Sequence, residues 1–561
     1  MILSGSDIIV ECLLEQGADT VFGYPGGAVL NIYDSLYKYS DKIRHIITSH
    51  EQGACHAADG FARATGRTGV VIATSGPGAT NLTTGLATAY MDSIPLVAIT
   101  GNVSCSLLGL DSFQEVDITG VTIPITKHNF IVKDIADLAD TLRLAFRIAG
   151  SGRKGPVLVD IPKDITAAKC EYARVEDNIE PAKPYIPGET LDRAAELIEK
   201  SAKPYIYAGG GVISSNAEAE LKEFAELCDA PVSCSLMGQG AFDQTDRRYI
   251  GMLGMHGTVK AAAALNDCDL FIGIGTRFSD RVIGDPAVFG KNAKIIHIDI
   301  DPAEFNKNVE VCETVKGDVK AVLRELCKRV SQKRNIWTDK MLITNFGEPV
   351  QHGTDEFPVT PQAVIEKLDE LTDGQAVIST EVGQNQMWAA QYYKYREPRS
   401  FISSGGLGTM GFGLGASIGA KVGCPDKTVV NIAGDGSFAM NLNELITASA
   451  HNIPIIEIVI NNNVLGMVRQ WQRLFYEKHF SQTTLDNRHI DYVKLGESFG
   501  IQTFVIAKAE EIEPTLKKAL EISKKAPCMI EVRIDRDLNV LPMIPAGKPV
   551  VNPITEIDLE A

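Results

Sequence analysis

The sequence lacks the features that mark membrane, secreted and nucleic-acid-binding proteins. It contains no run of about 18 apolar residues, the length that a membrane-spanning helix needs, so we expect no membrane span. Its formal net charge is −17, whereas nucleic acids and anionic membranes bind clustered basic residues, so neither is an expected partner. The 11 cysteines include no C-x-x-C pair, and the first residues resemble neither a secretion signal nor a transit peptide. These absences predict a cytoplasmic protein without a disulfide framework.

What the sequence does contain is a repeated alternation of short apolar runs and amphipathic segments. The runs end in Gly, Asp or Asn and are followed by helical patterns; examples are GVVIATSG, GPVLVDIP, LFIGIG, KIIHIDID and TVVNIAGDG. This pattern is typical of parallel strands that are buried on both faces. We therefore predict the α/β class with doubly wound parallel sheets, whose ligands lie beyond the carboxyl ends of the strands.

Two stretches divide the 561 residues into three blocks of domain size. Residues 175–190 are rich in proline and charge, and residues 331–361 lack sustained periodicity. We predict an N-terminal domain over 1–170, a central domain over 190–330 and a C-terminal domain over 360–561.

The third block contains a pattern that predicts a cation site. Residues 428–433 form a strand-like run that leads into Asp435, and residues 453–460 form the next one, which leads into Asn462. A right-handed crossover brings the ends of both strands to the same edge of the sheet. Asp435 and Asn462 can then converge on a hard cation such as Mg²⁺, which normally completes its shell with phosphate and water oxygens.

A helix is expected between these two strands. Asn441 and Glu444 resemble a capping box that opens it, with an apolar face behind them.

The stretch TSHEQGACHAADG, residues 48–60, crowds several residues that bind metals or move protons. His50 and His56 are six residues apart, about 600° around a helix, whereas a zinc pair needs the four-residue spacing of H-E-x-x-H. A metal site is therefore not favoured here. Glu51 is either a carboxylate stabilised by a helix N-terminus or an acid–base group.

Taken together, these motifs resemble the catalytic large subunits of acetohydroxyacid (acetolactate) synthases, in the thiamine-diphosphate enzyme family, over the whole chain. The matching stretches include FGYPGGAVLNIYD, HEQGACHAADGFARATG, TSGPGATN, DSFQEVD, GTRFSDRV, GGLGTMGFG, AGDGSF and NNNVLGMVRQWQ. The resemblance implies an N-terminal domain that faces the aminopyrimidine, a central FAD-binding domain and a C-terminal domain that faces the diphosphate and Mg²⁺. It also implies a homodimer or homotetramer with active sites at the subunit interface, and a small regulatory subunit as partner.

The resemblance assigns roles around the thiamine diphosphate. Glu51 would bond to the aminopyrimidine ring and favour the tautomer that removes the thiazolium proton. Asp435, Asn462 and the Val464 carbonyl would hold Mg²⁺, and Gly436 and Ser437 would offer donors to the diphosphate. Met410 would be an apolar wedge beneath the bent cofactor, or else a core methionine. The rest of the cofactor pocket would be formed by Pro77, Asn81, Val382, Gly383, Gln384, Asn385, Gly408, Gly434 and Met467.

Further roles concern the substrates and FAD. Gln114 and Lys163 would lie near the pocket mouth, and Arg281 would bind the carboxylate of the second 2-oxo acid. Trp471 would favour 2-oxobutyrate over pyruvate as acceptor by about 1–3 kcal/mol. On their own, GIGTRF and GGGVISS are weak dinucleotide signals. By resemblance, the FAD-binding residues would include Arg153, His256, Gly275, Arg277, Arg281, Asp299 and Asp318.

The expected reaction is the decarboxylation of pyruvate and transfer of the remaining two-carbon unit to pyruvate or 2-oxobutyrate. The products would be 2-acetolactate or 2-aceto-2-hydroxybutyrate, in the first common step of isoleucine and valine biosynthesis. The resemblance implies a structural rather than a redox role for FAD.

Four alternatives use related chemistry or none. A pyruvate decarboxylase typically carries paired histidines, and none of the 10 histidines here is adjacent to another. The sequence does not exclude a pyruvate oxidase. A catabolic acetolactate synthase lacks the FAD stretches and the tryptophan seen here. A non-catalytic regulatory homologue is disfavoured by the presence of Glu51, Asp435 and Asn462. One departure from the family is Gly415, where proline is common.

Overall fold

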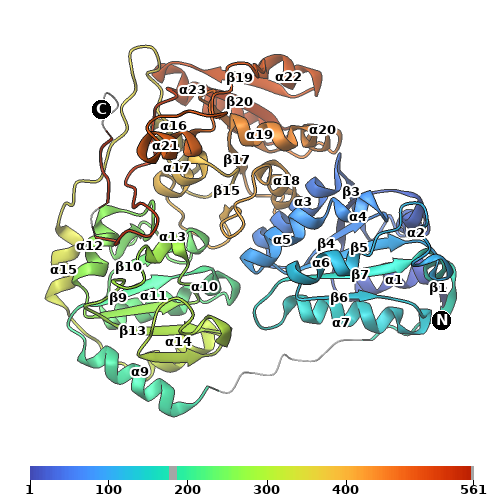
Figure 1. Ribbon diagram of the computed structural model, residues 1–561, viewed down its shortest axis with the longest axis horizontal. Helices are drawn as coiled ribbons and strands as arrows, with labels where there is room; N and C mark the ends of the chain where they lie inside the picture. Colours follow the sequence, from blue (N-terminus) through green and yellow to red (C-terminus); the bar gives the residue numbers. More distant parts are fainter. Residues whose placement is uncertain (176–185, 552, 558–561) are drawn as a thin grey trace.

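The computed structural model describes residues 1–175, 186–551 and 553–557, so most of the expected linker 175–190 lies outside the described residues. These residues form three six-stranded sheets and one antiparallel pair, β1 (Ile2–Ser4) with β8 (Lys169–Glu171). Figure 1 shows the N-terminal sheet in blue at the right, the central sheet in green at the lower left, and the C-terminal sheet in orange at the top. The prediction of an α/β fold with three doubly wound sheets is confirmed.

The N-terminal sheet consists of parallel strands in the order β3-β2-β4-β5-β7-β6. Its central strands are almost continuous apolar runs and are buried along their whole length, because helices cover both faces. The strands are β2 (Thr20–Tyr24), β3 (Arg44–Ile47), β4 (Gly69–Ala73), β5 (Leu96–Asn102), β6 (His128–Ile131) and β7 (Pro156–Pro162). The main helices are α1 (Gly5–Glu15), α2 (Leu30–Lys38), α3 (Glu51–Thr65), α5 (Thr83–Asp92) and α7 (Leu138–Gly150).

The central sheet has the order β11-β10-β9-β12-β13-β14. Counted along the chain this is 3-2-1-4-5-6, the order of sheets that bind dinucleotides at the point where the strand order reverses. That point lies between β9 and β12. The strands are β9 (Pro204–Ala208), β10 (Val232–Cys234), β11 (Tyr249–Met252), β12 (Leu270–Ile274), β13 (Lys294–Asp299) and β14 (Glu313–Lys316). The main helices are α9 (Gly188–Lys200), α10 (Gly210–Ser214), α11 (Glu218–Cys228), α12 (Val259–Asp267) and α14 (Val319–Cys327).

The C-terminal sheet has the order β16-β15-β17-β18-β20-β19, which repeats the order of the N-terminal sheet strand for strand. Both read 2-1-3-4-6-5 along the chain. The strands are β15 (Val377–Thr380), β16 (Phe401–Ile402), β17 (Val429–Gly434), β18 (Ile456–Asn461), β19 (Gln502–Ile506) and β20 (Cys528–Arg533). The main helices are α16 (Pro361–Thr372), α17 (Gln384–Tyr392), α18 (Gly413–Gly423), α21 (Gly466–Phe475) and α23 (Ile512–Ile522).

The connection between β17 and β18 differs from the sequence prediction. A helix begins directly at Asp435, as α19 (Asp435–Asn441), and is followed by a 3₁₀ turn, Leu442–Glu444, and by α20 (Leu445–Ala450). The Asn441 side chain caps no helix and donates to the Gly411 carbonyl at 2.7 Å. The Glu444 carboxylate accepts from the Ser49 backbone N–H of the N-terminal domain at 3.1 Å. The predicted capping box is therefore wrong, because both side chains serve long-range contacts.

Helices α3 and α18 bring the N-terminal and C-terminal domains into backbone contact. A Cβ atom at Gly60 would overlap the Ala416 carbonyl, and one at Gly419 would overlap the Ala57 carbonyl. A Cβ atom at Gly415 would lie 2.9 Å from the His56 Cβ. The departure from proline at position 415 therefore falls where α3 leaves no room for a larger residue.

Two segments outside the sheets pack on the central domain. The stretch 331–361 contains α15 (Ile336–Ile343), and its Trp337 Nε1 donates to the Asp267 carboxylate at 2.7 Å. Near the end of the chain, the Ile544 N–H donates to the Met255 carbonyl at 2.7 Å. No helix within the described ranges is both long enough and apolar enough to cross a bilayer.

Candidate active site

The carboxyl edge of the N-terminal sheet gathers five of the predicted site residues. Glu51 is the first residue of α3, directly after β3, and accepts a hydrogen bond from Asn81 Nδ2 at 2.9 Å. Pro77 begins the short helix α4 (Pro77–Thr80) after β4. Gln114 lies against this loop, because a Cβ atom at Gly76 would be 2.9 Å from the Gln114 Cα. Lys163 is exposed and begins α8 (Lys163–Ala167) after β7.

The start of α3 explains how its first residues are used. His50 is the N-cap, and its Nδ1 accepts from the Gln52 N–H at 3.0 Å. His56 is fully buried beneath Phe412, and burial lowers the pKa of its imidazole to about 3. Both histidines have structural contacts, and Glu51 keeps its carboxylate at the sheet edge.

The carboxyl edge of the C-terminal sheet brings together the three predicted metal ligands. Asp435 follows β17, and Asn462 and Val464 follow β18, so the crossover places them as the sequence predicts. Asn462 Oδ1 accepts from the Val464 N–H at 3.2 Å, which fixes the amide. Burial raises the pKa of the Asp435 carboxyl to about 7, although backbone N–H groups oppose the shift. A bound cation would offset the cost of burying this charge.

The donor set at this edge suits a hard cation with non-protein ligands. Within the described residues, no three His, Cys, Asp or Glu side chains are grouped to hold a metal. A cation at Asp435 would therefore depend on amide, carbonyl, phosphate and water oxygens, as Mg²⁺ sites commonly do.

The segment after β15 is held in place by its own polar contacts. Asn385 Nδ2 donates to the carbonyls of Glu381 and Ile432, at 3.0 and 2.7 Å. Gln384 Nε2 donates to Gln470 Oε1 at 3.1 Å, in helix α21. Gly383, with φ +154°, has a backbone conformation that L side chains rarely adopt.

Residues 408–411 form a turn between β16 and α18. Gly408 and Gly411 have positive φ values of 73° and 84°, and Met410 between them is half-buried. The Gly411 N–H donates to the Glu381 carboxylate at 2.7 Å, and so does the Ser437 hydroxyl. Ser437 thus directs its hydroxyl to Glu381, which leaves its backbone N–H as the donor for a ligand.

One cavity of about 1920 Å³ lies between the central and C-terminal domains and reaches the N-terminal domain. Its size exceeds that of a typical small-molecule pocket and is sufficient for a dinucleotide. All the predicted FAD residues line it: Arg153, His256, Gly275, Arg277, Arg281, Asp299 and Asp318. Five predicted cofactor or acceptor residues also line it: Val382, Gly383, Gly408, Met467 and Trp471.

Two glycines of the central sheet let separate turns meet at the point where the strand order reverses. A Cβ atom at Gly211 would lie 2.6 Å from the Gly275 Cα, so the turns after β9 and β12 pack main chain against main chain, and both glycines line the cavity. The two weak sequence signals, GGGVISS and GIGTRF, thus lie together at the position where sheets of this strand order bind dinucleotides.

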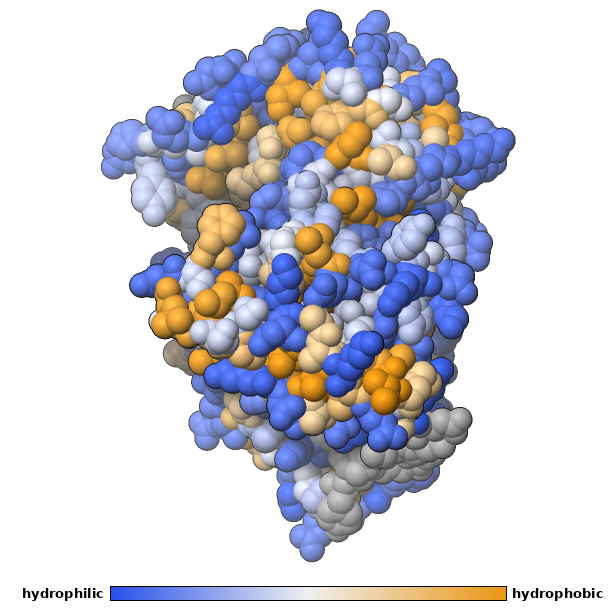
Figure 2. Space-filling view, turned by 90° about the vertical axis from the view of Figure 1, so that its right-hand side faces the viewer, coloured by the Kyte–Doolittle hydropathy of each residue, from blue (hydrophilic) through white to orange (hydrophobic). Residues whose placement is uncertain are grey.

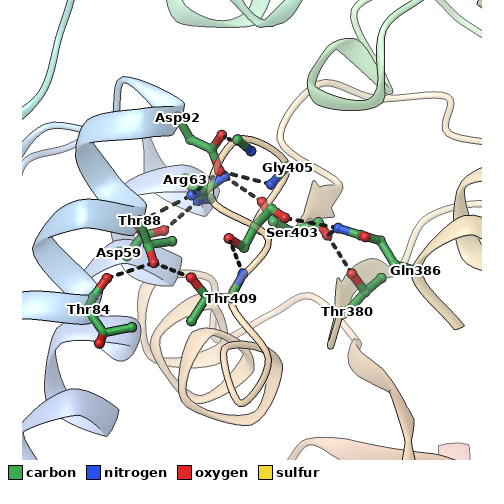
Figure 3. A network of polar contacts seen from close by, with 12 residues as sticks. Asp59, Arg63, Thr84, Thr88, Asp92, Thr380, Gln386, Ser403, Gly405 and Thr409 are labelled. Atoms are coloured by element: carbon green, nitrogen blue, oxygen red, sulfur yellow. Dashed lines mark hydrogen bonds and ion pairs between the residues drawn. The ribbon is translucent and has the colours of Figure 1, made fainter. Parts of the chain in front are cut away.

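A buried ionic network joins the N-terminal domain to the cavity wall (Figure 3). Arg63 pairs with Asp59 and, at 3.0 Å, with Asp92, and donates to the Ser403 carbonyl at 2.7 Å. The Asp92 carboxylate accepts from the backbone N–H groups of Gly405 and Gly406, at 3.1 and 2.7 Å. Thr88 and Thr409 share a further hydrogen bond of 2.7 Å.

Sequence reasoning missed this network and Glu381. Both join segments that are far apart in the chain, so a local pattern cannot reveal them. The signal available in the sequence was a charged residue at a position where a buried element normally has an apolar one. This applies to Arg63, Asp59, Asp92 and Glu381.

The predicted site residues thus fall into three groups. None of Glu51, Pro77, Asn81, Gln114 and Lys163 lines the large cavity, whereas the predicted FAD residues and Trp471 do. The third group lies at the edge of the C-terminal sheet, beside the cavity, and consists of Asp435, Asn462, Ser437 and Met410.

Comparison with known families agrees with this architecture. Three models of thiamine pyrophosphate enzymes match the chain: the N-terminal TPP binding domain over residues 3–121, the central domain over 191–326 and the C-terminal TPP binding domain over 381–532. Each match falls on one of the three large sheets. The protein is a thiamine pyrophosphate enzyme.

Similar proteins identify the family within this class. The acetolactate synthase large subunit of Corynebacterium glutamicum is 46% identical, covering 97% of this chain and 89% of that protein. A probable acetolactate synthase large subunit of Methanocaldococcus jannaschii is 45% identical, covering 100% and 96%. The large subunit of acetolactate synthase isozyme 3 from Escherichia coli is 43% identical, covering 96% of each chain. The chain belongs to the acetolactate synthase large-subunit family.

Proposed function

We propose that this enzyme decarboxylates pyruvate and transfers the two-carbon unit to pyruvate or 2-oxobutyrate, with thiamine diphosphate, Mg²⁺ and FAD. Acetolactate synthesis, in branched-chain amino-acid biosynthesis, is the activity of the family to which the chain belongs. The products are 2-acetolactate and 2-aceto-2-hydroxybutyrate, precursors of valine and isoleucine.

The C-terminal sheet edge supports binding of the diphosphate end of the cofactor. Asp435, Asn462 and the Val464 carbonyl would hold Mg²⁺, and the backbone N–H groups of Gly436 and Ser437 would donate to phosphate oxygens. When bound, thiamine diphosphate supplies the carbon nucleophile and the electron sink for loss of CO₂. Gly408 and Met410 would contact the middle of the cofactor from the turn before α18.

Glu51 acts at the aminopyrimidine end. Its carboxylate is held by Asn81 at 2.9 Å, so it presents one oriented oxygen to a ring nitrogen. Holding a proton between the Glu51 carboxyl and that nitrogen is general acid–base catalysis, which contributes about 10²–10⁴-fold to rate.

The observation that carries the acceptor assignment is that Arg281 and Trp471 line the same cavity as Gly408. Arg281 lies beside Met255 and is exposed toward this space, so its guanidinium can bind a carboxylate through two parallel hydrogen bonds. Trp471 projects from α21, with its ring centroid 5.1 Å from that of Phe475. Its face offers an apolar surface to the extra methylene of 2-oxobutyrate.

The central sheet supports FAD binding, because its strand order suits a dinucleotide and the cavity at its reversal point is lined by Gly211 and Gly275. The flavin is structural in this proposal and completes the cavity wall.

The separation of Glu51 from the cavity supports an active site completed by a second copy of the chain. Apolar residues stand exposed near the N-terminal sheet edge, among them Leu110 at 65% and Phe113 at 87%, next to Gln114. Figure 2 views the molecule from the side where Figure 1 shows the N-terminal domain, and hydrophobic residues lie among hydrophilic ones there. The relatives named as large subunits support a small regulatory subunit as partner. All eleven cysteines are free thiols, which supports a cytoplasmic location.

The test is product identity. Purified protein with thiamine diphosphate, Mg²⁺ and FAD is incubated with pyruvate, and the product is decarboxylated with acid to acetoin. Acetoin that forms only after acid treatment supports the proposal. Acetaldehyde as sole product indicates a decarboxylase, and oxygen-dependent formation of acetyl phosphate or acetate indicates an oxidase.

Competition between the two acceptors separates a biosynthetic from a catabolic enzyme. With equal concentrations of pyruvate and 2-oxobutyrate, we expect 2-aceto-2-hydroxybutyrate to dominate. Exclusive formation of acetolactate would contradict the role given to Trp471.

A further inference from the structure

A buried carboxylate after β15 joins three separate segments of the C-terminal domain. Glu381 has no exposed surface, and its carboxylate accepts from the Gly411 N–H and the Ser437 hydroxyl, each at 2.7 Å, and from the Leu414 N–H at 3.2 Å. Gly411 ends the turn 408–411, Leu414 lies in the first turn of α18, and Ser437 lies in the first turn of α19.

All three partners of Glu381 are donors, which is a set that only a carboxylate can accept in full. A glutamine would turn an NH₂ group toward one of them, because its amide has a single acceptor oxygen. Burial raises the pKa of Glu381 to about 7, and the three hydrogen bonds favour the charged form against burial. Hydrogen bonds to both of its oxygens therefore hold the carboxylate in place.

The Ser437 hydroxyl is fully used within this arrangement. It donates to Glu381 Oε2 and lies 3.2 Å from the Gly411 nitrogen, whose N–H it can accept. The side chain is 3% exposed. The hydroxyl thus faces the carboxylate rather than the edge where a diphosphate would lie.

We propose that Glu381 is the positioning residue that fixes the turn 408–411 against the start of α19, and that the Ser437 hydroxyl serves cofactor binding only through Glu381. This rests on the thiamine diphosphate site of the proposed function. The turn carries Gly408 and Met410, and α19 begins at Asp435, so Glu381 would set the spacing between the segment that would contact the middle of the cofactor and the segment that would hold its diphosphate end.

The test is a double-mutant cycle of Glu381→Gln and Ser437→Ala, read out as the Kd for thiamine diphosphate with Mg²⁺ and as kcat at saturating cofactor. Losing a hydrogen bond to a charged group should raise Kd at least about tenfold in Glu381→Gln. If Ser437 acts only through Glu381, the double variant should bind about as weakly as Glu381→Gln alone. Multiplying effects would show that the hydroxyl binds the cofactor directly, and an unchanged Kd in Glu381→Gln would remove Glu381 from this role; either result overturns the proposal.

Two further variants separate positioning from folding. Ser417→Ala deletes a buried hydroxyl of α18 that bonds to the Leu414 carbonyl at 2.7 Å and makes no contact with Glu381. It should lower the thermal midpoint without changing Kd or kcat. Glu381→Asp keeps the charge and should recover part of the affinity lost in Glu381→Gln. If Glu381→Gln does not fold, the same cycle run with Glu381→Asp decides between additive and non-additive effects.

The cofactor-binding readout separates this proposal from the reaction proposed above. Kd is measured by quenching of tryptophan fluorescence without substrate. A wild-type enzyme that yields acetaldehyde would refute the synthase reaction while leaving the coupling of Glu381 and Ser437 intact. A wild-type protein that binds thiamine diphosphate normally and shows additive variants would refute only the coupling.

Discussion

The N-terminal and C-terminal sheets have the same strand order but carry different groups at equivalent places. Helix α3 begins with Glu51, whereas α18, which follows the equivalent strand, begins with Gly413. After β17 the chain places Asp435, whereas after β4 it places Pro77. One edge thus offers a partly exposed carboxylate, and the other offers buried acids and backbone donors.

The difference shows that one scaffold can serve both ends of a cofactor. The strand order decides where a ligand can lie, and the residues at the strand ends decide which group is bound there. Four predictions can break or sharpen this comparison.

The largest effect is expected from Glu51→Gln at the N-terminal edge. We expect kcat to fall by about 10²–10⁴-fold, because an amide cannot exchange a proton with the cofactor ring. Stability should change little, since the amide oxygen can still accept from Asn81. The control is Glu444→Gln, which alters a buried glutamate that contacts the same segment at Ser49. It should lower the unfolding free energy and leave kcat within a few-fold; the reverse pattern would assign the chemistry to Glu444.

Arg63→Met tests the network that joins the two domains. The substitution leaves Asp59 and Asp92 buried without a cation, so we expect a loss of about 3–5 kcal/mol in unfolding free energy. Arg67→Met is the matched control, because Arg67 pairs with Asp19 at the surface, with side chains 44% and 57% exposed. It should cost about 1 kcal/mol or less. The unfolding free energies are measured by urea denaturation. Equal losses in the two variants would show that the buried network does not stabilise the contact between the two domains.

Acidification of the cofactor-free protein should affect the two sheets in opposite directions. Burial lowers the pKa of His45 to about 4 and that of His56 to about 3, so between pH 6.5 and 4 the unfolded chain binds protons first and the N-terminal domain loses stability. Burial raises the pKa of Glu381 to about 7, so as pH falls from 7 to 4.5 the folded C-terminal domain binds a proton first and gains stability. Each group contributes at most about 1.4 kcal/mol per pH unit.

Hydrogen exchange measured by mass spectrometry at pH 7 and 5, corrected for intrinsic rates, checks this prediction. Peptides of β4 should lose protection relative to peptides of β17. Asp160, whose pKa burial raises to about 6, opposes the histidines in part, so Asp160→Asn should enlarge the difference. A parallel change in both sheets would contradict the assignment.

The smallest effect is expected from Trp471→Leu. The ratio of 2-aceto-2-hydroxybutyrate to acetolactate should fall by about tenfold or less, because the apolar leucine side chain keeps part of a methylene contact worth about 1–3 kcal/mol. Phe475→Leu is the control, since the Phe475 ring lies tilted against that of Trp471 but does not line the cavity. An equal fall in both variants would place acceptor preference in the helix as a whole.

Much of the fold was accessible from sequence because its strands are local apolar runs. Asp435 and Asn462 were predicted at one edge because strands joined by a helical crossover are parallel, so their carboxyl ends lie at the same edge of the sheet. The helix start at Asp435 and the uses of Asn441 and Glu444 were not accessible, because side chains from other segments decide them. The contacts of Glu381 and Arg63 were likewise not accessible from the sequence, because each residue bonds to others that only the folded chain brings near.

The backbone contact between α3 and α18 has a mechanical consequence. Helices whose main chains touch at glycine and alanine positions cannot slide or tilt far without clashes of main-chain atoms. The N-terminal and C-terminal domains of one chain therefore move as a single body. Any opening that admits substrates must come from displacement of the central domain or of surface loops.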